Sequence, residues 1–229
     1  MNKALRIIIS LLFSLALTVG LLCVVTYSIA GSSGYMAKKF SVHANPDVTG
    51  VDPKEYPVLA QMITAYLTGH ADTMQTTLPV HGSLREAFNE KELTHMHDVQ
   101  ALLGLCLKVA LACGLVAILC LALALARFPD LRASLARVYL RIGPAVLILA
   151  GILAVWATID FDSLFRLFHK LLFTNNLWLL DPRTDLLLQL MPTAFFIGYA
   201  GDIAVIWLAS LAALSLTAAI YLKARKQRS

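Results

Sequence analysis

Long apolar stretches alternate with polar connections along this chain of 229 residues. A membrane-spanning helix needs about 20 apolar residues, and four stretches approach or exceed this length: 7–30, 101–126, 142–159 and 203–222. The first stretch is longer than the roughly 7–15-residue apolar core of a secretory signal, so we expect it to remain as an anchor. The pattern predicts an all-α membrane protein in which residues 1–229 form a single domain with four transmembrane helices.

The charged residues predict how these helices are oriented. Overall, 59% of the residues are hydrophobic and 14% are charged. Basic residues collect before the first span, between the second and third, and after the fourth: Lys3, Arg6, Arg127, Arg132, Arg137, Arg141, Lys223, Arg225, Lys226 and Arg228, with Asp130 as the only acid among them. By the positive-inside rule both termini are cytoplasmic, and segments 31–100 and 160–202 are extracytoplasmic. The net charge of +5 is therefore a topology signal and gives no support to nucleic-acid binding.

The four cysteines lie within the predicted spans, and the chain has no C-x-x-C motif. Cys106, Cys113 and Cys120 repeat every seven residues, which stacks them on one helix face as small packing residues. Thiol–disulfide exchange needs accessible thiolates, so this distribution argues against a membrane thiol oxidoreductase.

The first outer segment combines turn signals with two predicted helices. "GSSGY" at 31–35 is expected to be flexible, and the Asn-Pro, Gly and Asp-Pro steps of 43–53 predict a connector built from turns. Apolar residues recur at helical spacing from Pro53 or Pro57 to Leu67. A second helix is predicted to begin at Asn89 and to continue into the second span, with Glu92 as the capping-box partner of Asn89.

Two histidines, His95 and His97, lie on this second helix. Residues two positions apart on a helix point about 200° away from each other, so the two imidazoles cannot face the same site. His95 shares its face with Glu92, Asp98 and the apolar side of the following span, which makes it the better candidate for chemistry.

The second outer segment is apolar but interrupted by charges and prolines. Residues 160–173 predict an amphipathic helix lying at the depth of the lipid headgroups, with His169 on it. Trp178 suits the same interface, and 184–190 predicts a second short amphipathic helix. A lone interfacial histidine is most often a polar residue that reaches toward water. His95 and His169, predicted at matched depth, form a stronger candidate pair.

Two sequence stretches carry a resemblance to a known family. "VHGSLREAFNEKELTHMHDVQALL" at 80–103 and "LFHKLLFTNNLWLLDPRTDLLLQLMPTAFF" at 167–196 resemble the signatures of a bacterial membrane family, the lipoprotein intramolecular transacylases. The resemblance covers both outer segments and the four-span layout. His95 and His169 match the histidines of the family, and His97 occupies a variable position.

The resemblance implies an acyltransferase of the bacterial cell membrane, with its site on the extracytoplasmic face. Its substrates would be diacylated lipoproteins within membrane lipid, and the sn-2 acyl chain of the diacylglyceryl group would move to the α-amino group of the N-terminal cysteine. Ester-to-amide conversion is downhill and both groups belong to one substrate, so no cofactor and no metal is expected.

An attacking α-amine needs a group that accepts its proton. The expected general base is His95, oriented by Glu92 or Asp98, with His169 as second acid/base or oxyanion partner. The substrate-binding or oxyanion region is expected to include Glu92 and Asp98, and the resemblance adds Asn176, Trp178 and Asp181 to it.

Three alternatives remain open from the sequence. Ser83 could act as a nucleophile through an acyl-enzyme, although no G-x-S-x-G elbow surrounds it. His95 and His169 could instead ligate a haem or metal in a four-helix membrane protein. The chain could also be a structural membrane protein without chemistry.

Overall fold

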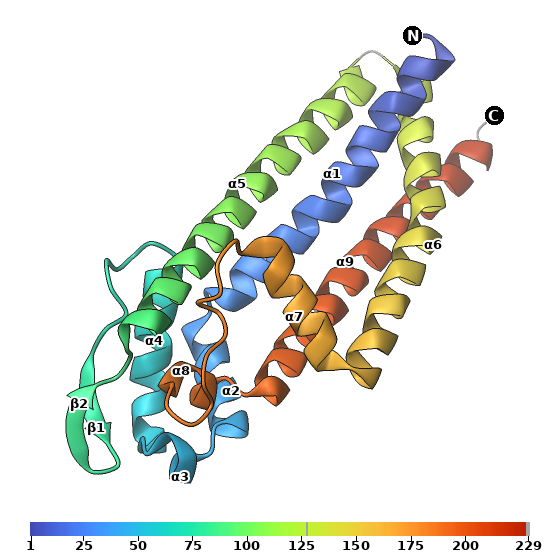
Figure 1. The fold of residues 1–229 in the computed structure, drawn as a ribbon. Coiled ribbons are helices and arrows are strands. Elements are labelled where there is room, and N and C mark those ends of the chain that lie inside the picture. The colour runs from blue at the N-terminus through green and yellow to red at the C-terminus, as the bar shows by residue number, and fades with distance from the viewer. Residues whose placement is uncertain (127, 228–229) are drawn as a thin grey trace. The chain divides into compact units, whose positions relative to one another are not determined.

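A computed structural model describes residues 1–126 and 128–227, and its framework consists of four long helices (Figure 1). These are α1 (Lys3–Ala30), α5 (Glu90–Ala126), α6 (Pro129–Ile159) and α9 (Thr193–Gln227), and each is long and apolar enough to cross a membrane. The predicted four-helix membrane fold is confirmed. Each helix extends beyond its predicted apolar stretch, because polar residues at the ends continue the backbone hydrogen bonding. Arg127 and Arg228, used above for orientation, lie outside the described residues, and the orientation stays a prediction.

The chain divides into two compact units, and the first contains Met1–Val25, Cys106–Ile159 and Asp202–Ser229. Here α5 approaches α1 closely along the cysteine face. A Cβ built on Gly20 would lie 2.9 Å from Cys113 Cβ, and Cys120 Sγ lies 3.9 Å from the carbonyl oxygen of Ile9. Small residues let membrane helices pack backbone against backbone, so the prediction that the cysteines are packing residues is confirmed for this face.

Polar contacts join the other helices of the first unit. The hydroxyl of Tyr139 on α6 donates to Leu211 O on α9 at 3.3 Å, and the Trp207 indole of α9 donates to Thr18 O on α1 at 2.9 Å. Many other apolar side chains of these helices are exposed, including Leu147, Ile148 and Val205. That exposure is expected for surfaces in contact with lipid.

The second unit contains Thr26–Leu105 and Asp160–Gly201, and its first part is more helical than the sequence predicted. The stretch 31–35, expected to be flexible, runs into α2 (Ser33–His43), and the stretch 43–53, expected to consist of turns, contains α3 (Pro46–Thr49). Ser32 and Asn45 cap these helices through their side chains. Serine and asparagine serve turns and helix N-caps equally well, which is why the turn interpretation was wrong here. After η1 (Pro53–Glu55), the predicted short helix is confirmed as α4 (Tyr56–Leu67), which packs against α2.

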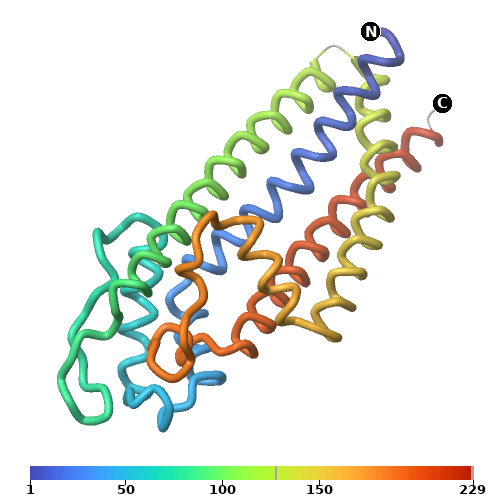
Figure 2. The backbone as a smooth tube through the Cα atoms, viewed as in Figure 1, coloured from blue at the N-terminus to red at the C-terminus, as the bar shows by residue number. Residues whose placement is uncertain are grey.

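A small β-hairpin, visible in teal in Figures 1 and 2, was not anticipated from the sequence. Strands β1 (Thr77–Val80) and β2 (Ser83–Glu86) pair antiparallel around His81 and Gly82. Both loop residues have positive φ, at 49° and 78°, as two-residue hairpin turns of the primed types require. The backbone N–H of His81 donates to Gly50 O at 2.8 Å, which attaches the hairpin to the end of α3.

The remaining elements of the second unit carry the candidate residues. The capping box at the start of α5 is confirmed: Glu92 N–H donates to Asn89 Oδ1 at 3.0 Å, and Asn89 N–H donates to Glu92 Oε2 at 2.8 Å. The amphipathic helix predicted over 160–173 is confirmed as a helix, α7 (Phe161–Leu172), with Asp160 as its N-cap. The last short helix, α8 (Leu186–Leu190), begins later than predicted because Asp185 is its N-cap. Whether α7 lies at a membrane surface stays a prediction.

Gly50 provides a direct test of the join between α3 and the hairpin. Its φ is +65°, and a Cβ at this position would lie 2.5 Å from the His81 ring. Gly50→Ala should therefore lower the free energy of unfolding by about 1–3 kcal/mol, measured by thermal unfolding in detergent. Gly34→Ala is the matched control, because Gly34 lies in α2 with open space around it. Equal stability of the two variants would contradict this account of the hairpin.

Candidate active site

The two histidines singled out by the sequence lie side by side within the second unit. His95 is on α5 and His169 is on α7, with ring centroids 6.0 Å apart. Each is only 7% exposed. Two buried imidazoles from segments far apart in the sequence form an arrangement that can both accept and donate protons, which makes this pair the candidate site.

Aromatic rings enclose the pair. Phe165 and Trp178 lie 4.1 and 4.9 Å from the His169 ring, and Phe173 lies 5.4 Å from His95 and 5.5 Å from His169 (centroid distances). Of these rings, only Trp178 was predicted as a site residue from the sequence. Phe165 and Phe173 were missed as site residues, although their spacing of four from His169 on a helical stretch was a usable signal.

The protonation pattern of His169 is fixed by one backbone contact. Its Nδ1 lies 2.8 Å from Phe165 O. A carbonyl oxygen can only accept, so Nδ1 carries the hydrogen in the neutral ring, and Nε2 is left with its lone pair. His95 differs, because its Nδ1 is buried and has no hydrogen-bond partner among the described residues.

Burial also determines the charge state of His169. Removal from water lowers the pKa of His169 below its ordinary value of 6.5, and the hydrogen bond to Phe165 O opposes this shift only in part. The imidazole is therefore neutral at pH 7 and can act as a proton acceptor.

Glu92 and Asp98, the carboxylates expected to orient His95, accept hydrogen bonds from other residues. Glu92 accepts from the backbone N–H groups of Asn89 and Leu187, the latter at 2.6 Å. Asp98 accepts from Asn175 Nδ2 at 2.8 Å. A helix N-terminus offers unpaired N–H donors, and Glu92 at the third helical position satisfies them. Among the described residues, no hydrogen bond joins His95 Nδ1 to either carboxylate, and the His95 ring lies against Phe173 and His169. That Glu92 or Asp98 orients His95 stays a prediction.

These carboxylates pin residues 173–187, which we call the pinned segment, to the start of α5. Besides the contacts of Glu92 and Asp98, Asn89 Nδ2 donates to Asp185 Oδ1 at 3.0 Å, and Lys91 donates to Leu179 O. Asp185 is 5% exposed. Asn89, Asn175 and Asp185 thus belong to the structure of the site, although they were not predicted as site residues from the sequence.

The three residues added by the resemblance lie within the pinned segment but in different environments. Trp178 is buried, and its indole N–H already donates to Asn175 O at 3.0 Å. Asn176 is exposed. Asp181 is paired with Arg183, whose guanidinium donates to both carboxylate oxygens at 3.0 and 2.6 Å and lowers the pKa of Asp181 to about 2. Of the three, Trp178 is the one in ring contact with His169.

His97 and Ser83 stand apart from the pair. His97 is exposed on the other face of α5, with its Nδ1 3.4 Å from the Tyr66 hydroxyl, so the predicted separation of the two histidines is confirmed. Ser83 begins the exposed strand β2. Within residues 1–126 and 128–227, no group of three or more histidine, cysteine or acidic side chains is placed to hold a metal.

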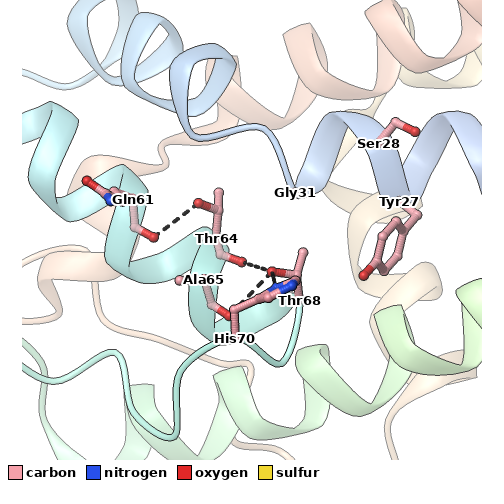
Figure 3. Close-up of a pocket in the computed structure, with 8 residues that line it drawn as sticks. All are labelled: Tyr27, Ser28, Gly31, Gln61, Thr64, Ala65, Thr68 and His70. Carbon is pink, nitrogen blue, oxygen red and sulfur yellow. Dashed lines mark hydrogen bonds between the residues drawn. The ribbon is translucent and has the colours of Figure 1, made fainter.

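The second unit also has a cavity of about 450 Å³ away from the paired histidines (Figure 3). Its lining comes from the end of α1, from α4 and from the turn after α4: Tyr27, Ser28, Gly31, Gln61, Thr64, Ala65, Thr68 and His70. His70 contributes the single imidazole of this lining, and its Nδ1 lies 2.9 Å from the Thr68 hydroxyl. Without a second acid/base group, this cavity is a weaker candidate for proton-transfer chemistry than the His95–His169 pair.

Comparisons with known proteins show which family and which solved structures the chain is similar to. Residues 7–196 match the family model of the lipoprotein intramolecular transacylase Lit. The chain is also similar to the solved structure of the membrane-integral lipoprotein intramolecular transacylase Lit from Bacillus cereus, with 20% identity, complete coverage of both chains and a TM-score of 0.77. A variant of that protein with a histidine replaced by arginine matches at 19% identity over 99% of this chain and 96% of the other, with a TM-score of 0.73. No curated protein matches the sequence.

The contact between His169 and Trp178 allows the pKa of His169 to be measured. In a protein that keeps Trp178 and has Trp156 and Trp207 replaced by phenylalanine, an imidazolium next to the indole quenches its fluorescence. Because burial lowers the pKa of His169, the quenching step should have its midpoint below pH 6.5. The His169→Ala variant should lack the step. A midpoint above pH 6.5 would contradict the buried, neutral imidazole.

Proposed function

The chain belongs to the lipoprotein intramolecular transacylase Lit family, and on this premise we propose that it moves an acyl chain from one position to another within a membrane lipoprotein. The observation that carries the proposal is the pair of buried imidazoles, His95 and His169, 6.0 Å apart. Acyl transfer between oxygen and nitrogen requires one proton to leave the nitrogen and one to reach the oxygen, and such a pair supplies the groups for this exchange.

The acyl donor that best fits is the sn-2 ester of a diacylglyceryl-modified N-terminal cysteine, and the acceptor is the α-amine of the same cysteine. The sn-2 ester carbonyl is attacked by the α-amine of the same cysteine, the C–N amide bond forms, and the C–O bond to glycerol breaks. The product is an N-acylated lipoprotein with a free glycerol hydroxyl. Because both groups belong to one substrate, most of the entropy of bringing them together is already lost, and no activated donor is needed.

His169 is the proposed general base. Its Nδ1 hydrogen is directed to Phe165 O, so Nε2 presents a lone pair that can take the proton from the attacking amine. This assignment exchanges the two roles expected from the sequence. The imidazolium formed in this step then returns the proton to the departing glycerol oxygen, so the protons balance over the full reaction.

His95 is the proposed partner of the developing oxyanion. It is 7% exposed and lies beside His169, so a neutral imidazole there can donate an N–H to the carbonyl oxygen as negative charge builds up. It makes this contribution as a hydrogen-bond donor without giving up its proton. A buried donor is more effective than one in water because its field is less screened.

The aromatic rings around the pair support transfer over hydrolysis. Phe165, Phe173 and Trp178 surround the imidazoles and keep the site apolar. Exclusion of water protects an ester from hydrolysis while the amine attacks. The exposed apolar side chains of α7, such as Leu171 and Phe168, suit contact with lipid in which the acyl chains of the substrate remain.

The proposed orientation follows from the basic residues. The predicted spans are flanked on one side by Lys3, Arg6, Arg132, Arg137 and Arg141, so by the positive-inside rule both termini are cytoplasmic. The segments that carry His95 and His169 are then extracytoplasmic, which is the side on which the anchored N-terminus of a lipoprotein lies.

The roles of the histidines can be tested with purified enzyme and a diacylated lipoprotein. His169→Ala should lower the rate about 10²–10⁴-fold, as removal of a positioned acid/base does, and His95→Ala about 10²–10³-fold, as removal of an oxyanion donor does. The double variant should be little worse than His169→Ala, because groups that act as a unit are not additive. Mass spectrometry of the lipoprotein N-terminus measures the product.

His97→Ala is the matched control, since it removes an exposed imidazole from the same helix. It should keep most of the wild-type rate. A His169→Ala or His95→Ala enzyme of normal abundance and near wild-type rate would remove that residue from the proposed mechanism.

The orientation is tested by labelling with a membrane-impermeant thiol reagent. In a protein without its native cysteines, Ser83→Cys should be labelled from outside intact cells, and Lys226→Cys should be labelled only after the cells are opened. Both positions are exposed, so accessibility within the fold does not limit the reaction. The reverse pattern would invert the orientation and place the histidines on the cytoplasmic face.

A further inference from the structure

In the first unit, a group of charged side chains surrounds a cavity of about 150 Å³. We call it the basic cavity, and its lining comes from α1 and α6: Lys3, Arg6, Ile7, Ser134, Arg137, Val138 and Arg141. Each charged side chain of this lining is a cation. The acyl-transfer mechanism proposed above does not use the cavity.

The convergence of these cations follows from helix geometry. On α6 the lining positions are 134, 137, 138 and 141, and on α1 they are 3, 6 and 7, which are spacings of three and four that place residues on one helix face. A buried contact between Ser10 Oγ and Ser134 Oγ at 2.9 Å holds the two faces together. Charges that served only to orient the helices would not need to point into one cavity.

The charges of the basic cavity are not balanced by the described part of the chain. Asp130 lies 3.6 Å from Arg6, but it also pairs with Arg225 at 3.0 Å. Arg137 and Arg141 make no ion pair within residues 1–126 and 128–227. Four like charges around a small volume repel one another, and a bound anion relieves that repulsion.

Arg132, on the same helix α6, is an arginine whose N–H donors are hydrogen-bonded within the protein. Its guanidinium donates to Ala124 O and Leu125 O at 3.0 and 2.9 Å, where the last carbonyl groups of α5 lack helical partners. Within residues 1–126 and 128–227, the arginines of the basic cavity make no such contacts with carbonyl groups of α5. Their donors are available for a ligand.

We propose that the basic cavity binds the phosphate group of an anionic phospholipid. Arginine presents its donors in a fork that matches phosphate oxygens, and the Ser134 hydroxyl adds a further donor. The volume suits a small charged group, because pockets for larger organic ligands occupy roughly 300–1,000 Å³. Basic pockets between membrane helices at the positively charged side bind lipid headgroups by the same chemistry.

The apolar part of the lining favours a lipid over free phosphate as the source of this group. Ile7 and Val138 line the cavity together with the cations, and Ile7 is 41% exposed at the start of an apolar helix. A ligand that is anionic at one end and apolar at the other satisfies both parts of this lining.

Native mass spectrometry of the purified protein in neutral detergent tests the proposal. Phosphatidylglycerol, phosphatidylcholine with the same acyl chains, and inorganic phosphate are titrated separately. We expect one phosphatidylglycerol per chain, bound more tightly than phosphatidylcholine, and weaker binding at higher salt as NaCl rises from about 50 to about 500 mM. Inorganic phosphate that binds as tightly as phosphatidylglycerol would overturn the lipid assignment in favour of the free anion.

Substitutions locate the binding. Arg141→Gln should weaken phosphatidylglycerol binding about fivefold, and Arg137→Gln with Arg141→Gln about 25-fold, if each charge contributes as a basic residue near an anionic lipid does. Lys223→Gln is the matched control, because Lys223 is an exposed cation of the same unit outside the cavity. Equal weakening in Lys223→Gln and Arg141→Gln, or wild-type binding that ignores salt and headgroup charge, would overturn the proposal. The wild-type measurements do not depend on how the variants fold.

Discussion

Two buried carboxylates, Glu92 at the start of α5 and Asp185 at the start of α8, impose the constraint on which the candidate site depends. Glu92 is 1% exposed and Asp185 is 5% exposed, and a buried carboxylate without donors is costly. Their donors are backbone N–H groups, the Asn89 amide and the Thr184 hydroxyl. The pinned segment is therefore held to α5 by the need to satisfy these oxygens.

This constraint reaches the imidazoles through two contacts. Asn175, which donates to Asp98, also accepts the Trp178 indole N–H through its carbonyl oxygen. Trp178 in turn lies against His169. The acidic residues near the histidines thus hold the pinned segment in place, and the aromatic rings contact the imidazoles directly.

The first unit relies on a different kind of contact. Lipid is as apolar as the side chains of the spans, so burial of apolar surface gives little drive for helices to associate there. Close backbone approach at Gly20 and Cys113, and hydrogen bonds such as Trp207 to Thr18 O, provide the specificity instead. The basic cavity formed by α1 and α6 belongs to the same unit, and its polar groups line the phosphate site that we propose.

The sequence by itself determined the elements whose causes are local. Four apolar stretches fixed the spans, because their length is set by the hydrocarbon thickness, and the capping box at Asn89 and Glu92 fixed the start of α5. The angular difference between His95 and His97 followed from helix geometry alone. The sequence did not identify α2 or the hairpin, because serine, asparagine and glycine serve turns, caps and hairpin loops alike.

Only the tertiary structure decided which partners the polar groups take. Glu92 and Asp98 lie on the His95 face of α5, yet each also accepts from a residue far away in the sequence, 95 positions for Glu92 and 77 for Asp98. The tautomer of His169 depends on the carbonyl of Phe165, and the meeting of His95 with His169 depends on where α7 packs. Sequence spacing gives the direction of a side chain on its own helix, whereas hydrogen-bond partners across segments are chosen by which donors the fold brings within about 3 Å.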